Sequence, residues 1–166
     1  MVCVENNPQY VAVGRRVMPE ARWIQADVLD LPDMAEVLGE FDCAISNPPF
    51  GPVPRKRNSP GGYTGHRFEY HLIAVAATLA RRGVFIIPQS AAPFHYSGKR
   101  RLEDGQGDAE YHRFTTATGI DLHPNCGIDT TYYGADWRGI RPRVEVVTVD
   151  FSERTTDAAT KITSPS

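Results

Sequence analysis

Strand-like and helix-like segments alternate along the first half of this chain, and this alternation constrains the fold more than any other feature. Apolar runs with the length and composition of buried strands lie at residues 2–5, 22–27, 41–46 and 84–88. Segments with apolar residues spaced three and four apart, typical of helices, lie between them at residues 8–18, 31–40 and 68–82. Parallel strands need long crossovers, which are usually helices. The pattern therefore predicts an α/β fold with a mostly parallel sheet.

Capping and breaking residues set the bounds of the predicted helices. Asn7 is a good N-cap, and Pro8 follows it at the first helical position, where the fixed φ and missing N–H of proline are tolerated. Pro19 ends that helix. A proline also opens the short second helix, and Gly83 is expected to close the third.

The second half of the chain gives fewer signals. Residues 109–119 are predicted to form a helix, and residues 143–151 alternate in polarity like a strand near a sheet edge. We expect one domain over residues 1–151, followed by a polar, disordered tail over residues 152–166.

Composition excludes some classes of function and location. The net charge of −2 gives no overall attraction to nucleic acid, so any such binding needs a local basic patch. The longest apolar stretch, at residues 72–80, is too short to span a bilayer, and the first ten residues lack the pattern of a secretory signal. Cys3, Cys43 and Cys126 are odd in number and form no C-x-x-C motif, which predicts a reducing, cytoplasmic location.

Three predicted strands end in polar residues at the sheet edge where α/β folds bind ligands: Glu5, Asp27 and Asn47. An acid at the end of a strand is where nucleotide-binding folds accept hydrogen bonds from ribose hydroxyls, which suits Glu5. The Asp27 carboxylate can accept from the exocyclic amine of an adenine. Each acid also has a structural interpretation, Glu5 as an acid at a helix N-terminus and Asp27 as a turn residue.

Asn47-Pro48-Pro49-Phe50 follows the third strand as a rigid corner, because two consecutive prolines forbid a further ladder or helix. The Asn47 side-chain oxygen and the Pro48 carbonyl would be two fixed acceptors. Acceptors aimed at both N–H groups of an aromatic amine localise its lone pair and make it a better nucleophile. The Phe50 ring offers a stacking face to a flipped-out base. The structural alternative is an ordinary proline-rich strand exit.

The segment at residues 51–67 is rich in Gly, Pro and Ser and is predicted to be a loop. Its Arg55, Lys56 and Arg57 can neutralise phosphates, and its Tyr63 can stack on a base, so we assign these four residues to nucleic-acid binding. The alternatives are solvated cations and a tyrosine that packs internally. The sequence "HPNC" at residues 123–126 has no second ligand pair, and we predict no metal site.

On these motifs, residues 1–151 resemble the class I S-adenosylmethionine-dependent methyltransferases. The resemblance is to the amino-methyltransferases with an [Asn/Asp/Ser]-Pro-Pro-[Tyr/Phe/Trp] motif, and bacterial and phage DNA adenine-N6 methyltransferases are the nearest type. Besides "NPPF", the runs "VCVENNP" and "IQADVLDL" are similar to the second-strand and third-strand motifs of the family, "GVFIIP" is similar to its fifth strand, and "RVEVVTVDF" is similar to its antiparallel seventh strand. The resemblance implies a Rossmann-like methyltransferase fold with an antiparallel edge strand.

The resemblance also implies roles for the residues above. S-adenosylmethionine would be the cofactor, with its ribose on Glu5, its adenine on Asp27 beside Val28, and a contact to Asn47. Residues 47–50 would be catalytic, and the reaction would be methyl transfer to an exocyclic amine, foremost adenine N6 in DNA. The alternatives are an RNA base or a protein glutamine as substrate. A non-catalytic remnant, or a partner subunit that binds nucleic acid or another chain, is the alternative from a different class.

One part of the family pattern is absent. The family opens with a strand and a Gly-rich loop that holds the methionine part of the cofactor, whereas this chain begins at what resembles the second strand. The Gly-rich runs at residues 61–65 and 105–107 do not follow predicted strands and do not replace that loop. The missing strand would lie between the second and fourth strands, so we expect a preceding segment or a second chain to complete the sheet.

Overall fold

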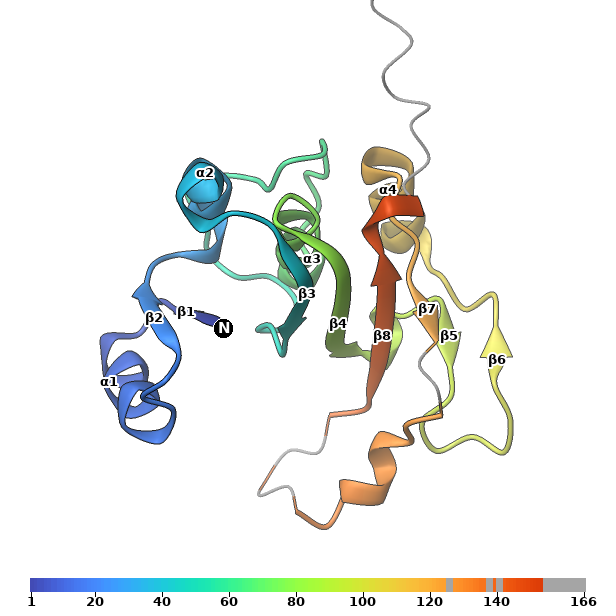
Figure 1. The fold of residues 1–166 in the computed structure, drawn as a ribbon. Coiled ribbons are helices and arrows are strands. Elements are labelled where there is room, and N and C mark those ends of the chain that lie inside the picture. Colours follow the sequence, from blue (N-terminus) through green and yellow to red (C-terminus); the bar gives the residue numbers. More distant parts are fainter. Residues whose placement is uncertain (125–126, 137–138, 140–141, 154–166) are drawn as a thin grey trace, which may run out of the picture.

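The computed structural model describes residues 1–153 apart from 125–126, 137–138 and 140–141. It is a mixed α/β fold whose strands form three separate sheets (Figure 1). The predicted α/β class is confirmed. The predicted tail at residues 152–166 lies outside the described residues from 154 onward, and Ser152 belongs to the 3₁₀ helix η4, Phe151–Glu153.

The first sheet is a parallel pair, β1 (Val2–Glu5) and β2 (Arg22–Gln25), connected by helix α1 (Pro8–Val17). The predicted cap is confirmed, since the Asn7 side chain accepts from the Gln9 backbone N–H at 2.9 Å. β2 ends two residues earlier than predicted, because Asp27 instead caps the 3₁₀ helix η1 (Val28–Met34). The predicted second helix is this 3₁₀ segment followed by one turn of α-helix, α2 (Ala35–Leu38).

The second sheet has the strand order β3-β4-β8-β7. β3 (Phe41–Ser46) and β4 (Ala80–Pro88) are parallel, with helix α3 (Phe68–Ala76) between them in the chain. β8 (Val144–Asp150) runs antiparallel to β4, as predicted. It is not an edge strand, because β7 (His123–Pro124) pairs with its other side.

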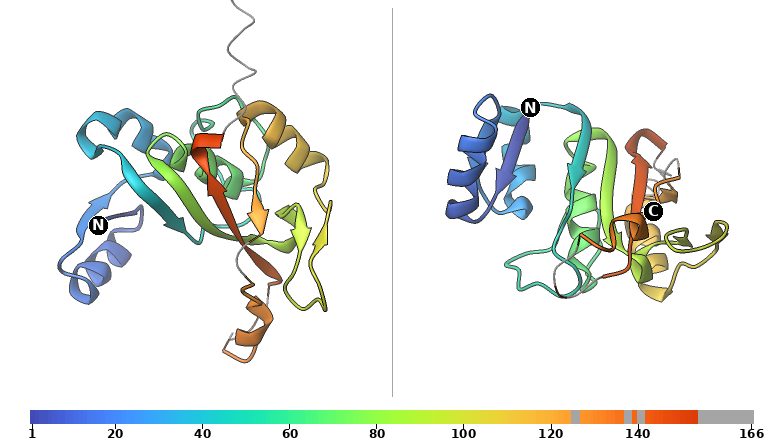
Figure 2. Two further views of the ribbon diagram at one scale, coloured as in Figure 1. Left: turned by 45° about the vertical axis from the view of Figure 1, so that its right-hand side comes forward. Right: turned by 90° about the horizontal axis from the view of Figure 1, so that it is seen from below.

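The remaining elements come from the second half of the chain. They are the hairpin β5 (Phe94–His95) and β6 (Glu103–Asp104), the predicted helix α4 (Ala109–Thr118), and the 3₁₀ helices η2 (Gln89–Ala91) and η3 (Thr130–Tyr133). Figure 2 shows β1, β2 and α1 on one side of β3 and these later elements on the other. No helix among the described residues is long and apolar enough to cross a membrane.

Gly83 does not close α3, and the predicted helix over residues 68–82 is six residues too long. α3 ends at Ala76, and Gly83 lies inside β4. A Cβ atom at Gly83 would lie 2.2 Å from Phe85 Cε2, so this glycine makes room for a fully buried ring. The apolar residues before it suit either a helix or a buried strand, and in the structure the chain from Ala80 onward pairs with β3 as a strand.

Gly83→Ala should therefore lower the free energy of unfolding by about 1–3 kcal/mol, the usual cost of overpacking a well-packed core. Urea denaturation followed by circular dichroism measures this difference. Arg82→Ala is the matched control, since Arg82 is an exposed neighbour on the same strand, and it should stay within about 0.5 kcal/mol of wild type. Equal stabilities for the two variants would contradict this account of Gly83.

Candidate functional site

The two acids predicted to bind a nucleotide lie at the carboxyl ends of the parallel strands β1 and β2. Glu5 is the last residue of β1 and pairs in register with Gln25, two residues before Asp27. Glu5 Oε1 accepts from the Asn7 backbone N–H at 2.7 Å, and Asp27 Oδ1 accepts from the Leu29 N–H at 3.0 Å. Both carboxylates are half-buried, so each combines a local capping role with an exposed portion at the strand ends.

The Asn47–Phe50 corner leaves the carboxyl end of β3 with its asparagine exposed. Pro48 is buried, Pro49 is exposed and Phe50 is half-buried. The asparagine amide is therefore accessible at a sheet end, and the inner proline anchors the backbone beneath it.

A buried carboxylate fastens this corner to the first turn of α3. The Gly51 N–H donates to Glu69 Oε2 at 2.8 Å, and the Phe68 N–H donates to the Gly51 carbonyl at 2.9 Å. Gly51 has a φ of +74°, which favours glycine at this turn, and Glu69 is only 1% exposed. Sequence reasoning missed Glu69, because an acid in the first turn of a helix ordinarily indicates only a favourable dipole interaction.

Glu69→Ala should free the corner and lower the free energy of unfolding by about 1.5–3 kcal/mol, the range for a hydrogen bond to a charged group. The Gly51 amide should also lose protection in hydrogen-exchange measurements. Glu69→Gln keeps an acceptor oxygen and should retain part of that protection. Unchanged Gly51 exchange in Glu69→Ala would show that the corner is held by the prolines alone.

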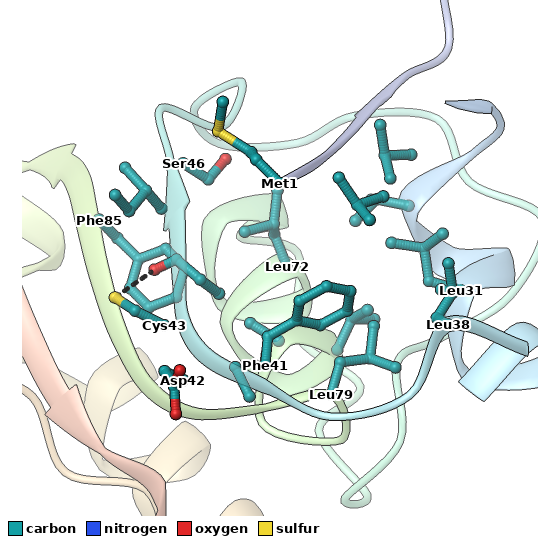
Figure 3. A pocket seen from close by; sticks show the side chains of 18 residues that line it. Met1, Leu31, Leu38, Phe41, Asp42, Cys43, Ser46, Leu72, Leu79 and Phe85 are labelled. Carbon is teal, nitrogen blue, oxygen red and sulfur yellow. Dashed lines mark hydrogen bonds between the residues drawn. The ribbon is translucent and has the colours of Figure 1, made fainter. Parts of the chain in front are cut away.

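A cavity of about 450 Å³ separates β1 from β3 (Figure 3). Within the described residues, β1 pairs only with β2 and β3 only with β4, so the two facing edges have no partner strand. We name this cavity the slot, and it lies where we expect the further strand. Val4 and Ser46, the neighbours of Glu5 and Asn47 in the chain, are among the residues that line it. Its lining comes from β1, β3, α3 and the η1–α2 segment and includes Val2, Val4, Leu31, Phe41, Ala44, Ile45, Leu72, Val75 and Leu79.

Two of the three loop cations are engaged within the protein. Arg57 donates to Asp33 Oδ2 at 2.7 Å and to the Leu29 carbonyl at 2.9 Å, and the hydrogen bond to Asp33 raises the pKa of Arg57. Arg55 donates to the Gly65 carbonyl at 2.7 Å and so closes the loop on itself. Lys56 is exposed, and of the three it is placed best for a phosphate.

Tyr63 is fully buried, so the predicted stacking of its ring on a base does not fit this structure. Its hydroxyl donates to Glu110 Oε1 at 2.6 Å, and burial raises the pKa of Tyr63 well above its usual value. The internal-packing alternative describes its role. Sequence spacing could not show this, because the partner lies on α4, 47 residues further along the chain.

Among the described residues, Ser59 and His71 are the one serine–histidine pair joined by a hydrogen bond. Ser59 Oγ lies 2.8 Å from His71 Nδ1, and the Ser59 N–H donates to the same nitrogen, which leaves Nε2–H to donate to the Gly65 carbonyl. Both side chains are buried, and burial lowers the pKa of His71. The pair therefore anchors the loop to α3 and presents no nucleophile to solvent.

Among the described residues, no group of three or more His, Cys, Asp or Glu side chains is close enough to hold a metal ion. His123 and Pro124 of the "HPNC" run form β7, and Cys126 lies outside the described residues. Cys3 and Cys43 are free thiols.

Comparison with known proteins adds little to this geometry. No family model matches the sequence, and no curated protein matches it. The crystal structure of Thermoplasma acidophilum 1320 is similar with a TM-score of 0.44 and 17% sequence identity, over 89% of this chain and 63% of that one. The chain thus spans less than two thirds of the length of that protein, and a likeness at this level carries no argument about function.

Proposed function

We propose that this chain is the methyltransferase part of an S-adenosylmethionine-dependent enzyme that methylates an exocyclic amine, foremost adenine N6 in DNA. One observation carries the proposal. The exposed Asn47 sits at the carboxyl end of β3 on a corner locked by two prolines and fastened by Glu69. Acceptors held this rigidly need little reorganisation when a reacting amine arrives.

Asn47 and Pro48 would act on the amine that receives the methyl group. The Asn47 side-chain oxygen and the Pro48 carbonyl would each accept from one N–H of the target nitrogen and draw it toward tetrahedral geometry. The half-buried Phe50 ring would stack on the base once it has left the duplex. The nitrogen would lose its extra proton readily after transfer, because it is then positively charged.

Glu5 and Asp27 fit the adenosine half of the cofactor. Two carboxylates at neighbouring strand ends suit the ribose hydroxyls and the adenine amine, with Val28 beside the ring. When bound, S-adenosylmethionine would supply an electrophilic methyl group on a sulfonium. The described residues offer no Gly-rich turn after a strand for the methionine half. The part of the site beside the slot is therefore incomplete, and we expect weak cofactor binding by this chain alone.

A partner subunit is the second candidate function, and the slot favours it. A chain with a slot between the strands that lead to Glu5 and Asn47 can serve as one part of a shared site. Methylation of an RNA base or of a glutamine amide would use the same acceptors, and the exposed Lys56 favours a nucleic acid over a protein substrate because it can contact a phosphate.

In a preparation that methylates DNA, Asn47→Ala should slow methyl transfer by about two to three powers of ten, the loss typical of removing one oriented polar group. Single-turnover transfer of a labelled methyl group measures the rate. Affinity for S-adenosylhomocysteine should change little, because Glu5 and Asp27 carry the adenosine. Asn47→Asp keeps an acceptor and should retain more activity than Asn47→Ala. If Asn47→Ala transferred methyl groups at the wild-type rate, Asn47 would be a structural turn residue and the proposal would be wrong.

Lys56→Ala should reduce the slope of log affinity for DNA against log salt concentration by about one, the effect of losing one phosphate contact. Arg57→Ala should change the slope less, since two aspartates, Asp30 and Asp33, already pair with Arg57. Fluorescence anisotropy over a salt series measures both slopes. If wild type and Lys56→Ala had equal slopes, Lys56 would be a solvated side chain that contacts no phosphate.

A further inference from the structure

The hairpin of β5 and β6 carries a run of cations that the proposed site does not use. The two strands are joined by residues 96–102, with the sequence "YSGKRRL". Gly98 has a φ of +73°, which favours glycine at this turn, and Lys99, Arg100 and Arg101 follow it. We call residues 96–102 the hairpin tip.

A buried carboxylate of β8 holds the start of the hairpin tip in place. Glu145 is 0% exposed, and it accepts from the Tyr96 and Ser97 N–H groups at 2.9 and 3.0 Å and from the Ser97 hydroxyl at 2.9 Å. Gln89 Nε2 donates to the same carboxylate at 2.6 Å. A buried charge is costly unless hydrogen bonds compensate it. These bonds therefore fix the backbone just before the cations.

The hairpin tip lies toward the same end of the sheet as the Asn47–Phe50 corner. Gln89 directly follows β4 and donates through Nε2 to the Ser97 carbonyl at 3.1 Å, so the tip is bound to the carboxyl end of that strand. β3 is the parallel neighbour of β4, and the corner follows its carboxyl end. In Figure 1, β3 and β4 run toward the bottom of the picture, where the connection between β5 and β6 also lies.

A further arginine lies at this end of the sheet. The Gln89 N–H donates to the Arg143 carbonyl at 2.9 Å, which places Arg143 beside the carboxyl end of β4 and directly before β8. Arg100, Arg101 and Arg143 are all exposed, and within the described part of the chain none of their side chains forms an ion pair or a hydrogen bond. Their guanidinium groups are therefore available to an external anion.

Two acids near the hairpin tip already have other partners. Glu103 pairs with Lys99 at 2.7 Å. Asp129 accepts from the Gly98 N–H at 3.1 Å and from the Thr131 hydroxyl at 2.6 Å. Neither carboxylate is paired with an arginine of the tip, so the arginines keep their full hydrogen-bonding capacity.

We propose that Arg100, Arg101 and Arg143 bind the phosphate backbone of the nucleic acid that is methylated at the corner. The net charge of the chain is −2, so exposed cations at one end of the sheet give a local attraction that the whole protein lacks. Guanidinium groups bind phosphate oxygens in a bidentate manner, and such contacts fix orientation and register. This inference rests on the proposed function, and DNA and RNA share the phosphate chemistry that it requires.

The test is binding of labelled nucleic acid by the full chain, measured by fluorescence anisotropy over a salt series. The probes are a DNA duplex of about 20 base pairs and the RNA duplex of the same sequence. Arg100→Gln combined with Arg101→Gln should reduce the slope of log affinity against log salt concentration by about two, because two phosphate contacts are lost. Arg143→Gln should reduce it by about one. The probe that wild type binds more tightly should show these losses, which identifies DNA or RNA as the partner.

The matched control is Arg15→Gln combined with Arg16→Gln. It removes the same charge from two arginines that are also exposed and adjacent in the chain. These arginines lie in the last turn of α1, which leads back from the carboxyl end of β1 to the amino end of β2. They therefore lie at the end of the β1–β2 sheet away from Glu5, and their loss should change the slope by less than about 0.5.

Three results would overturn this inference. The first is that wild type binds neither probe, or binds with the same slope as the variant without Arg100 and Arg101. The second is an equal loss of slope in the α1 control, since net charge alone would then explain the effect. The third is arginine-dependent binding of polyglutamate that is as tight as binding of either nucleic acid, because the partner would then be an acidic protein surface.

The binding assay needs no methyl transfer, so its failure differs from a failure of the proposed function. A chain that shows the arginine-dependent slope and never methylates would refute the proposed function alone. A chain that methylates nucleic acid and keeps its slope without Arg100 and Arg101 would refute this inference alone.

Discussion

Helix α3 is buried along nearly its whole length, and the corner, the loop and the central sheet are all held through it. Its first turn carries Glu69, which receives the Gly51 N–H. Tyr70 on the next position donates its hydroxyl to the Ala91 carbonyl at 2.7 Å, beyond the end of β4. The following residue, His71, fixes the loop through Ser59. Three consecutive side chains thus bind three different parts of the fold, and burial makes each of these bonds costly to lose.

This anchoring changes what the loop at residues 51–67 can do. A Gly- and Pro-rich segment with several cations suggests a mobile arm for phosphates, yet most of its polar groups bond inward. Arg67 forms a paired contact with Asp108. Burial raises the pKa of Asp108, but the hydrogen bonds from Arg67 and from the Tyr111 backbone N–H, together with the Arg67 charge, outweigh burial and lower that pKa. The loop is therefore a structured wall beside the corner, where Lys56 is exposed and the exposed Arg57 is paired with Asp33.

The slot separates the β1–β2 sheet from the sheet that contains β3. Free strand edges next to an apolar cavity are costly for a protein to expose, because they invite unwanted pairing. Here they border the two strand ends that carry Glu5 and Asn47. Val4 and Ser46, the residues before Glu5 and Asn47, line the same slot from different strands.

The sequence by itself determined the local elements at the site. Apolar runs placed β1, β2 and β3, proline and asparagine fixed the start of α1, and the two prolines fixed a corner after β3. These features depend on φ, hydrogen-bonding capacity and side-chain periodicity within a few residues, which a single sequence displays.

Only the tertiary structure decided what depends on distant partners. It ended α3 at Ala76 because the chain from Ala80 onward pairs with β3, and it buried Tyr63, whose hydroxyl donates to Glu110. It also placed β8 inside the sheet by pairing β7 beyond it, and it brought Glu69 to the corner. Periodicity records which face of an element is apolar and says nothing about which other element covers that face, so these outcomes required the packed fold.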